Sequence, residues 1–320
     1  MVRPELEEAV ERVRTGRIAS STEATFFALD KMLQALAEGG VGEFAELALR
    51  LTRARPTSAL LVNATRELVR EVAEHRGEPL EEIAERARRK VEELKGRIRS
   101  AIEASAAVAE RRIEPGDTLL TTSYSLFVKQ VVRNVLERGR DVRVVVTESR
   151  PGGEGLRMAS ELSSMGCDVT LVVDSAVRYV MKGVDKVLLS AECVTANGAV
   201  VNKVGSSQIA LAAHEARVRV FVVTTSMKFS PETVVGELVE IPEADASEVR
   251  ELLRKKGLEG VKVKAPLFDV TPPEYIDAII TERGLMAPSF AMMAVRDLYG
   301  WPPKLLPLEE ALRDLMKGGG

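Results

Sequence analysis

The chain of 320 residues is poor in several residue types that mark particular classes of protein. Its two cysteines are too few for a disulfide framework or a thiolate metal cluster, and it has only two histidines. Aromatic residues make up 4% of the chain and the formal net charge is -3, which argues against base-stacking platforms and against a basic surface for nucleic acid. No apolar run approaches the ~20 residues that span a bilayer, and the first residues lack the apolar core of a signal peptide. We therefore expect a cytoplasmic protein with no metal site and no contact with membrane or nucleic acid.

Amide side chains are also scarce, with four Asn and three Gln in the whole chain. Two of the Asn and one Gln nevertheless fall within residues 197–208, together with Lys203 and two Gly. Neutral donors and acceptors, one cation and the close backbone approach that Gly permits suit a polyhydroxylated, phosphorylated small molecule. A polar turn between a strand and a helix explains the same residues equally well. This window alone leaves both interpretations open.

The composition otherwise describes a globular protein with an ample core. Charged residues are 29% of the chain, many of them Arg and Glu, which together with few amides is typical of a thermophile. A length of 320 residues with 45% hydrophobic residues fits one large domain or two ordinary ones. We predict a division near residue 114, with a helical N-terminal domain over 1–113 and an α/β domain over 114–320.

The first half is predicted to be helical throughout. Apolar residues recur at helical spacing over 5–13, from about 20 through 44–51, over 58–74 and over 81–111. Ser20 and its neighbours, and Thr57 or Ser58, are candidates for N-cap residues.

In the second half, short runs of β-branched and other apolar residues alternate with helical patterns. Strands are predicted at 118–122, 143–147, 168–174, 185–190 and 218–224. Nearly continuous apolar strands that alternate with helices indicate a parallel sheet covered on both faces, so this half is predicted to be a Rossmann-like layer sandwich. The turn after the first strand has no Gly-x-Gly-x-x-Gly, which disfavours a dinucleotide, and no other cofactor is expected. A polar helix at 245–256 is predicted to leave the sheet, and residues 276–315 are predicted to be helical.

Polar side chains follow the predicted strands, at the edge of the sheet where open α/β sheets bind their ligands. Residues 121–125 supply hydroxyls and a phenol, and Asp174 and Glu192 end two later strands. Arg150 lies beside a Gly-rich turn that enters a helix, an arrangement that can hold a phosphate group. Residues 55–58, Arg-Pro-Thr-Ser, have the same character at a helix start. These clusters favour a small-molecule pocket over simple helix capping.

Several motifs occur in an order that resembles one superfamily. They are Val146-Thr-Glu-Ser-Arg-Pro-Gly-Gly-Glu-Gly155, Asn197-Gly with Asn202-Lys-Val-Gly-Ser, and Lys264-Ala-Pro-Leu-Phe-Asp-Val-Thr-Pro-Pro-Glu-Tyr-Ile276. The chain resembles a superfamily of three groups. One group comprises the alpha, beta and delta regulatory subunits of translation initiation factor two B with their archaeal homologues. The other two are ribose-1,5-bisphosphate isomerase and methylthioribose-1-phosphate isomerase. The resemblance implies a helical domain, a Rossmann-like domain, a pocket between them and symmetric self-association.

Within that superfamily the chain departs from the isomerases at two positions. The isomerases resemble one another in a Thr-His-Cys motif, where this chain has Thr121-Thr-Ser123, and a hydroxyl exchanges protons less readily near neutral pH than a thiol. They also carry Gly-Ala-Asp, where this chain has Ser190-Ala-Glu192. The N-terminal Arg-Gly-Ala phosphate loop is altered as well, to Arg17-Ile-Ala. The resemblance implies that the Cys and the Asp of these two motifs are the catalytic groups of the isomerases, and the alpha-type regulatory subunits resemble this chain at both of these catalytic positions.

The resemblance therefore leads us to expect a regulatory-subunit-like protein that binds a sugar phosphate or nucleoside monophosphate and contacts translation initiation factor two. It would form a homodimer or a higher homo-oligomer. The predicted ligand-binding residues are Arg55, Thr57, Ser58, Arg150, Asn202 and Lys203.

The alternative is an aldose–ketose isomerase that acts on ribose-1,5-bisphosphate. Glu192 and Ser123 would then be the catalytic residues, and Asp174 or Tyr124 would have to replace the missing thiol. A scaffold with a vestigial pocket is a third interpretation, which predicts no ligand. Lys228, after the fifth strand, is either a crevice residue, as in the superfamily, or an ordinary exposed lysine.

Overall fold

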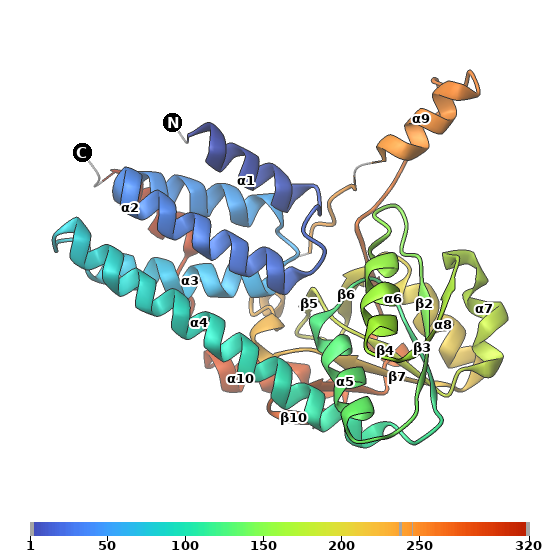
Figure 1. The fold of residues 1–320 in the computed structure, drawn as a ribbon. Helices are drawn as coiled ribbons and strands as arrows, with labels where there is room; N and C mark the ends of the chain where they lie inside the picture. The colour runs from blue at the N-terminus through green and yellow to red at the C-terminus, as the bar shows by residue number, and fades with distance from the viewer. Residues whose placement is uncertain (1–2, 237–238, 245, 318–320) are drawn as a thin grey trace.

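The fold is a layer of long helices packed on one side of an α/β sandwich (Figure 1). The structure is a computed structural model that describes residues 3–236, 239–244 and 246–317. It confirms the predicted fold class, a helical N-terminal half followed by a Rossmann-like half. The four N-terminal helices are α1 (Pro4–Arg14), α2 (Ser21–Ala54), α3 (Ala59–Glu74) and α4 (Leu80–Ala109).

The helical layer follows from the apolar stripes seen in the sequence. In α4 the residues Ile83, Ala87, Val91, Leu94 and Ile98 recur at helical spacing and are all buried, while most of the charged residues between them are exposed. Ser20 caps α2 as predicted, because its hydroxyl accepts a hydrogen bond from the backbone N–H of Glu23 at 3.1 Å. The α2 helix is kinked at Gly40, whose φ of 76° lies in the left-handed region that glycine adopts readily.

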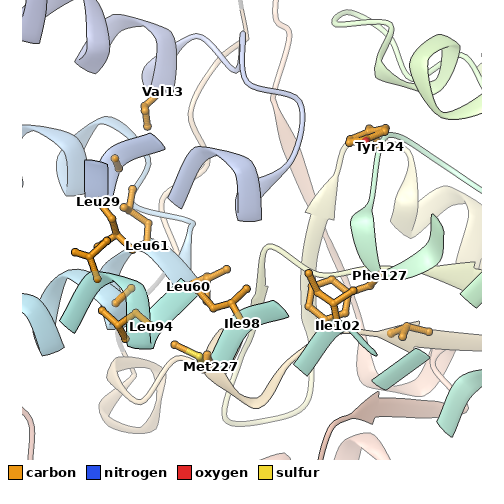
Figure 2. Close-up of a cluster of buried hydrophobic side chains, with 14 of the residues drawn as sticks. Val13, Leu29, Leu60, Leu61, Leu94, Ile98, Ile102, Tyr124, Phe127 and Met227 are labelled. Atoms are coloured by element: carbon orange, nitrogen blue, oxygen red, sulfur yellow. The ribbon is translucent and has the colours of Figure 1, made fainter. Parts of the chain in front are cut away.

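A single hydrophobic cluster joins the helical layer to the sandwich. Figure 2 shows this cluster running from Val13 and Leu29 in the helical layer to Ile102 of α4 and then Phe127 and Tyr124 beside the sheet. Both halves therefore share one close-packed core.

The sandwich is built on a seven-stranded sheet in the order β10-β9-β7-β4-β1-β2-β3, parallel except for β10. The order in which the strands are added reverses between β1 and β4, because β2 and β3 lie on one side of β1 while β7 and β9 lie beyond β4. The strands are β1 (Thr118–Thr121), β2 (Arg143–Thr147), β3 (Asp168–Val172), β4 (Lys186–Leu189), β7 (Arg219–Val223), β9 (Ala278–Thr281) and β10 (Gly284–Met286).

Helices cover both faces of this sheet, as the continuous apolar strands predict. Leu119 packs in the cluster with α4, α5 and α6, whereas Leu120 packs in the other cluster with α7, α8 and α10. The connecting helices are α5 (Leu126–Glu137), α6 (Glu154–Ser164), α7 (Val177–Val180), α8 (Ser206–Ala216) and α10 (Ala291–Tyr299).

Two parts of the second half differ from the sequence prediction. A three-stranded antiparallel sheet is formed by β5 (Cys193–Val194), β6 (Val200–Lys203) and β8 (Phe268–Thr271), none of which lies in a predicted strand. The prediction that residues 276–315 are all helical is wrong, because β9 and β10 precede α10. Ile279 and Ile280 are too short an apolar run to distinguish strand from helix, and pairing with β7 decides the outcome.

Helices α9 and α11 do not cover the sheet of the sandwich. Helix α9 (Ser247–Lys255) extends away from the body and has no buried residue among those described, which matches the predicted excursion (Figure 1). Asp245, at the start of the predicted excursion, lies outside the described residues. Helix α11 (Leu308–Lys317) returns to pack on α2 and α3. The domain boundary at 113/114 therefore stays a prediction.

Candidate active site at the reversal point of the sheet

The predicted polar strand ends meet at the carboxyl ends of β1 and β4, where the strand order reverses. This is the place where open α/β sheets bind ligands. The turn after β1 holds Ser123 with a φ of 60°, and the backbone N–H of Ser123 donates to the Ser149 hydroxyl at 2.6 Å. Ser125 then caps α5. The turn after β4 contributes Glu192, whose N–H pairs with the carbonyl of Val201 on β6.

A small polar cavity lies between these turns and the helical layer, and we call it the site cavity. Its volume is about 40 Å³, room for a few water molecules but too little for a sugar phosphate. The functional side chains that line it are Arg55, Ser123, Tyr124, Glu154, Glu192, Asn202, Lys203 and Lys228, and residues 18–22 of the helical half form another wall.

A buried ion pair occupies the centre of the site cavity. The Arg55 guanidinium donates to both carboxylate oxygens of Glu192, with Nε–Oε1 at 2.7 Å and Nη2–Oε2 at 3.1 Å. Both side chains are more than nine-tenths buried. The Arg55 Nη1 atom is buried with no hydrogen-bond partner among the described residues, so one donor of this guanidinium is free to bind a ligand oxygen.

A second buried ion pair lies at the neighbouring wall. Lys203 on β6 donates to Glu154 Oε1 at 2.5 Å, and Glu154 begins α6 directly after the Gly-rich turn. The Glu154 Oε2 atom is buried and has no partner within the described part of the chain. Beside Lys203, the Asn202 amide donates to the Ser206 hydroxyl at 2.9 Å. Arg55 and Lys203, two of the three cations predicted to bind ligand, are thus neutralised by buried carboxylates in this structure.

Lys228 is the third cation of the site cavity. It ends a short 3-10 turn (Ser226–Lys228) after β7, and its Nζ donates to the carbonyl of Ala191 at 2.6 Å. Burial lowers the pKa of Lys228 to about 8; the neighbouring Glu192 carboxylate raises this pKa and Arg55 lowers it. Lys228 is therefore a crevice residue rather than an exposed lysine, and it is ready to exchange a proton near neutral pH.

The two groups proposed to replace a thiol are engaged with other partners. The Tyr124 hydroxyl lies 2.9 Å from both Lys129 Nζ and Glu161 Oε2, and burial raises the Tyr124 pKa. Asp174 does not line the site cavity, because its carboxylate accepts the backbone N–H groups of Ser149 and Arg150 at 2.8 and 2.7 Å.

Three predicted ligand-binding residues lie outside the site cavity. The Arg150 guanidinium is exposed and pairs with Glu248 of α9 at 2.9 Å. Thr57 lines a different opening, and the Thr57 and Ser58 hydroxyls are buried without a partner among the described residues. Arg55, Asn202 and Lys203 are brought together with Ser123 and Glu192, and the ligand-binding roles of all these residues stay predictions.

Sequence reasoning missed two carboxylates that organise the site. Glu154 was read as part of a Gly-rich phosphate turn, yet it neutralises Lys203. Asp269 of β8 accepts hydrogen bonds from the backbone N–H groups of Gly205 at 2.7 Å and Ser207 at 3.1 Å, at the N-terminus of α8. The pairing of β6 with β8 sets Asp269 opposite Asn202, and no local sequence pattern predicts a contact between residues 67 positions apart.

The cysteines are not part of the site chemistry. Burial raises the pKa of Cys167 to about 11 and that of Cys193 to about 12, which keeps both as thiols. Within the described ranges, no group of three or more His, Cys, Asp or Glu is placed to hold a metal ion, and no helix has the length and apolarity needed to cross a membrane.

Comparison with known proteins now places the chain. The family model described as the initiation factor 2 subunit family matches residues 18–288. The chain belongs to this family. It is 39% identical over 303 residues to the ribose 1,5-bisphosphate isomerase of Archaeoglobus fulgidus, covering 93% of this chain and 94% of that protein. The ribose 1,5-bisphosphate isomerase of Methanocaldococcus jannaschii is 42% identical over 254 residues, which cover 79% of this chain and 80% of that one.

Among solved structures, the Pyrococcus horikoshii translation initiation factor eIF-2B superposes with a TM-score of 0.74 at 25% identity, covering 90% of this chain and 98% of that chain. The resemblance to the superfamily is confirmed. The expected regulatory-subunit function, with its contact to translation initiation factor two, is wrong, because relatives at 39% and 42% identity are isomerases by name. The two changed catalytic positions misled the sequence interpretation, since we gave two side chains more weight than similarity along the whole chain.

Proposed function

We propose that this protein is an aldose–ketose isomerase that acts on ribose-1,5-bisphosphate. Similarity over nearly the whole chain to isomerases of that name supports the substrate. The observation that carries the chemistry is the buried carboxylate of Glu192, which shares one cavity with Arg55 and Lys228 at the reversal point of the sheet.

Isomerisation of ribose-1,5-bisphosphate moves hydrogen from C2 to C1 and opens the sugar ring, so it needs a base and an acid. In our proposal Glu192 removes the C2 proton while Lys228, with a pKa of about 8, protonates the ring oxygen as the bond from C1 to that oxygen breaks, which leaves a C1=C2 enol. Glu192 then returns a proton to C1 while Lys228 recovers the proton of the C2 hydroxyl, so that C2 becomes the ketone. Lys228 thereby takes the part that a thiol would play at position 123. In this proposal the Ser123 hydroxyl binds substrate and takes no part in proton transfer.

Substrate phosphate is proposed to displace carboxylates from their cations. Arg55 and Lys203 are held by Glu192 and Glu154 in the closed cavity, and a dianionic phosphate is a stronger partner for a guanidinium than a carboxylate. Transfer of Arg55 to phosphate frees Glu192 to act as a base. The same transfer requires the site cavity to open beyond its present 40 Å³, with residues 18–22 as the wall that gives way.

The test is ketose formation from ribose-1,5-bisphosphate, measured at elevated temperature, by the native chain and by variants. We expect Glu192→Gln and Lys228→Met each to lower turnover by about a hundredfold or more, as for loss of a general base or acid. Glu137→Gln, an exposed residue at the end of α5, is the matched control and should keep full activity. If the Glu192→Gln variant turns over the substrate at the native rate, the base lies elsewhere.

The family resemblance also leads us to propose that the chain self-associates. Helix α9 supports this, because its Val249 and Leu252 are exposed and it has no buried residue among those described. A helix of nine residues is marginal in water without a partner surface. Sedimentation of the native chain should give a mass of at least two copies, and Leu252→Glu should reduce that mass if α9 lies in the interface.

A further inference from the structure

A second and much larger opening lies on the other side of the turn that carries Lys228. It is bounded by α3, α4, α10 and the segments that follow β7 and β9, and we call it the basic opening. Its volume is about 740 Å³, within the ~300–1,000 Å³ range of small-molecule sites. Thr225, Ser226 and Met227 line it, whereas the next residue, Lys228, lines the site cavity.

The lining of the basic opening is strongly cationic, although the chain as a whole is acidic. Its basic residues are Arg66, Arg70, Arg97, Arg283 and Lys304, against two acidic residues, Glu67 and Glu282. Two carboxylates in the lining and Glu232, which pairs with Arg66 from outside it, leave an excess of two positive charges around one concavity, which attracts small anions.

The carboxylates of the basic opening are already engaged. Glu67 pairs with Arg97 at 2.7 Å, and Glu282 accepts the backbone N–H of Ser226 at 3.1 Å. Arg66 is held by the Asn63 amide oxygen at 2.7 Å and by Glu232.

Three cations remain uncommitted. Arg70, Arg283 and Lys304 are exposed and form no ion pair among the described residues. They come from α3, from the turn between β9 and β10, and from the segment after α10, so their convergence is a product of the fold rather than of one charged helix face.

We propose that the basic opening is a second ligand site, which binds a phosphate-bearing small molecule through Arg70, Arg283 and Lys304. Two guanidinium forks and one ammonium match the charge and the oxygens of a phosphomonoester dianion. Met227, Leu298 and the ring of Tyr299 form an apolar part of the wall, so the ligand carries a ring or another apolar group beside its phosphate. This site is independent of the isomerase proposal, since none of its three cations lines the site cavity.

The test uses phenyl phosphate as the probe and calorimetric titration of the full chain. Arg55→Gln removes a cation of the site cavity and should leave phenyl phosphate binding at the basic opening unchanged. Arg70→Gln combined with Arg283→Gln should weaken that binding by about tenfold or more, because two charge-assisted contacts are lost. The matched control is Arg111→Gln, an exposed arginine away from both cavities, which should bind like the native chain.

The single variants Arg70→Gln and Arg283→Gln repeat the test if the double variant does not fold, as judged by circular dichroism. Benzyl alcohol should bind more weakly than phenyl phosphate, since it lacks the anion. The proposal is overturned if phenyl phosphate does not bind, or if Arg55→Gln abolishes binding while the double variant retains it. It is also overturned if the double variant lowers the oligomeric mass and phenyl phosphate has no effect on the native chain, which would identify the opening as a subunit interface.

Discussion

The cations proposed to bind a phosphate group are held in opposite ways in the two cavities of this protein. In the site cavity of about 40 Å³, Arg55 and Lys203 each form an ion pair with a carboxylate. In the basic opening of about 740 Å³, Arg70, Arg283 and Lys304 are exposed and have no ion pair among the described residues. A buried charge must be paired because desolvation costs several kcal/mol, whereas water supports an exposed charge. A ligand of the site cavity therefore has to displace a carboxylate from its cation, whereas a ligand of the basic opening is attracted to cations that are not ion-paired among the described residues.

The strongest way to break this comparison is to remove one member of the buried pair. Arg55→Met should lower the free energy of unfolding by about 3–5 kcal/mol, because it leaves Glu192 buried and unpaired. Denaturant unfolding of Arg55→Met, Glu192→Leu and the double variant forms the cycle, and the double variant should recover most of the loss.

The matched control for that cycle is the exposed ion pair of Arg53 and Glu309. It is bidentate like the buried pair, with the Nε–Oε1 and Nη2–Oε2 distances both at 2.9 Å. Arg53→Met should cost about 1 kcal/mol or less, as exposed pairs do. Equal costs for Arg55→Met and Arg53→Met would contradict the account of the site cavity as a desolvated pair.

The third cation of the site cavity sharpens the comparison through pH. Lys228 has a folded pKa of about 8, below its ordinary value of 10.5, so the unfolded chain binds this proton more tightly between these two values. Stability contributed through this group therefore rises as pH increases from about 8 to 10.5. The difference in pKa corresponds to about 3 kcal/mol.

Lys228→Met should accordingly be more stable than the native chain at pH 7, by up to about 3 kcal/mol less the lost hydrogen bond to Ala191. That advantage should shrink as pH approaches 10.5. Urea unfolding at pH 7, 8.5 and 10 measures it. A stability difference that does not change with pH would mean that Lys228 is not held in a desolvated position.

Salt should separate the two cavities as well. Phenyl phosphate binding at the basic opening should weaken several-fold between about 0.05 M and 0.5 M sodium chloride, because exposed charges are screened over a Debye length of a few Å at high salt. Sugar phosphate bound in the site cavity should respond less, since its contacts exclude water. Titrations at the two salt concentrations with native chain and Arg55→Gln measure both responses, and equal slopes would remove the distinction.

The smallest expected effect is on the stability of the chain when the basic opening holds no ligand. Arg70→Gln removes an exposed cation that repels its neighbours, so the free energy of unfolding should change by about 0.5 kcal/mol or less. A loss comparable with that of Arg55→Met would show that Arg70 is structurally committed and would argue against a ligand role.

The sequence predicted the local architecture well where the apolar pattern is continuous. The strands at 118–121, 143–147 and 219–223 and the stripe of α4 follow directly from such patterns. The convergence of Ser123 and Glu192 was also predictable, because the carboxyl ends of parallel strands meet at one edge.

What the sequence could not supply is pairing across distance. Contacts such as Arg55 with Glu192 and Asn202 opposite Asp269 join segments far apart in the chain, and residue type alone does not select the partner. The pairing of the Arg150 guanidinium with Glu248 of α9 is a further contact of this kind, and the phosphate role of Arg150 stays a prediction. The three cations of the basic opening carry no motif at all.

The most direct test of the isomerase proposal is to incubate the native chain with ribose-1,5-bisphosphate in deuterium oxide and to follow the sugar by nuclear magnetic resonance. Proton transfer through Glu192 predicts that a ketose accumulates and that deuterium from solvent enters at C1. Binding of the sugar phosphate with no ketose, at a temperature where the chain stays folded, would contradict the proposal.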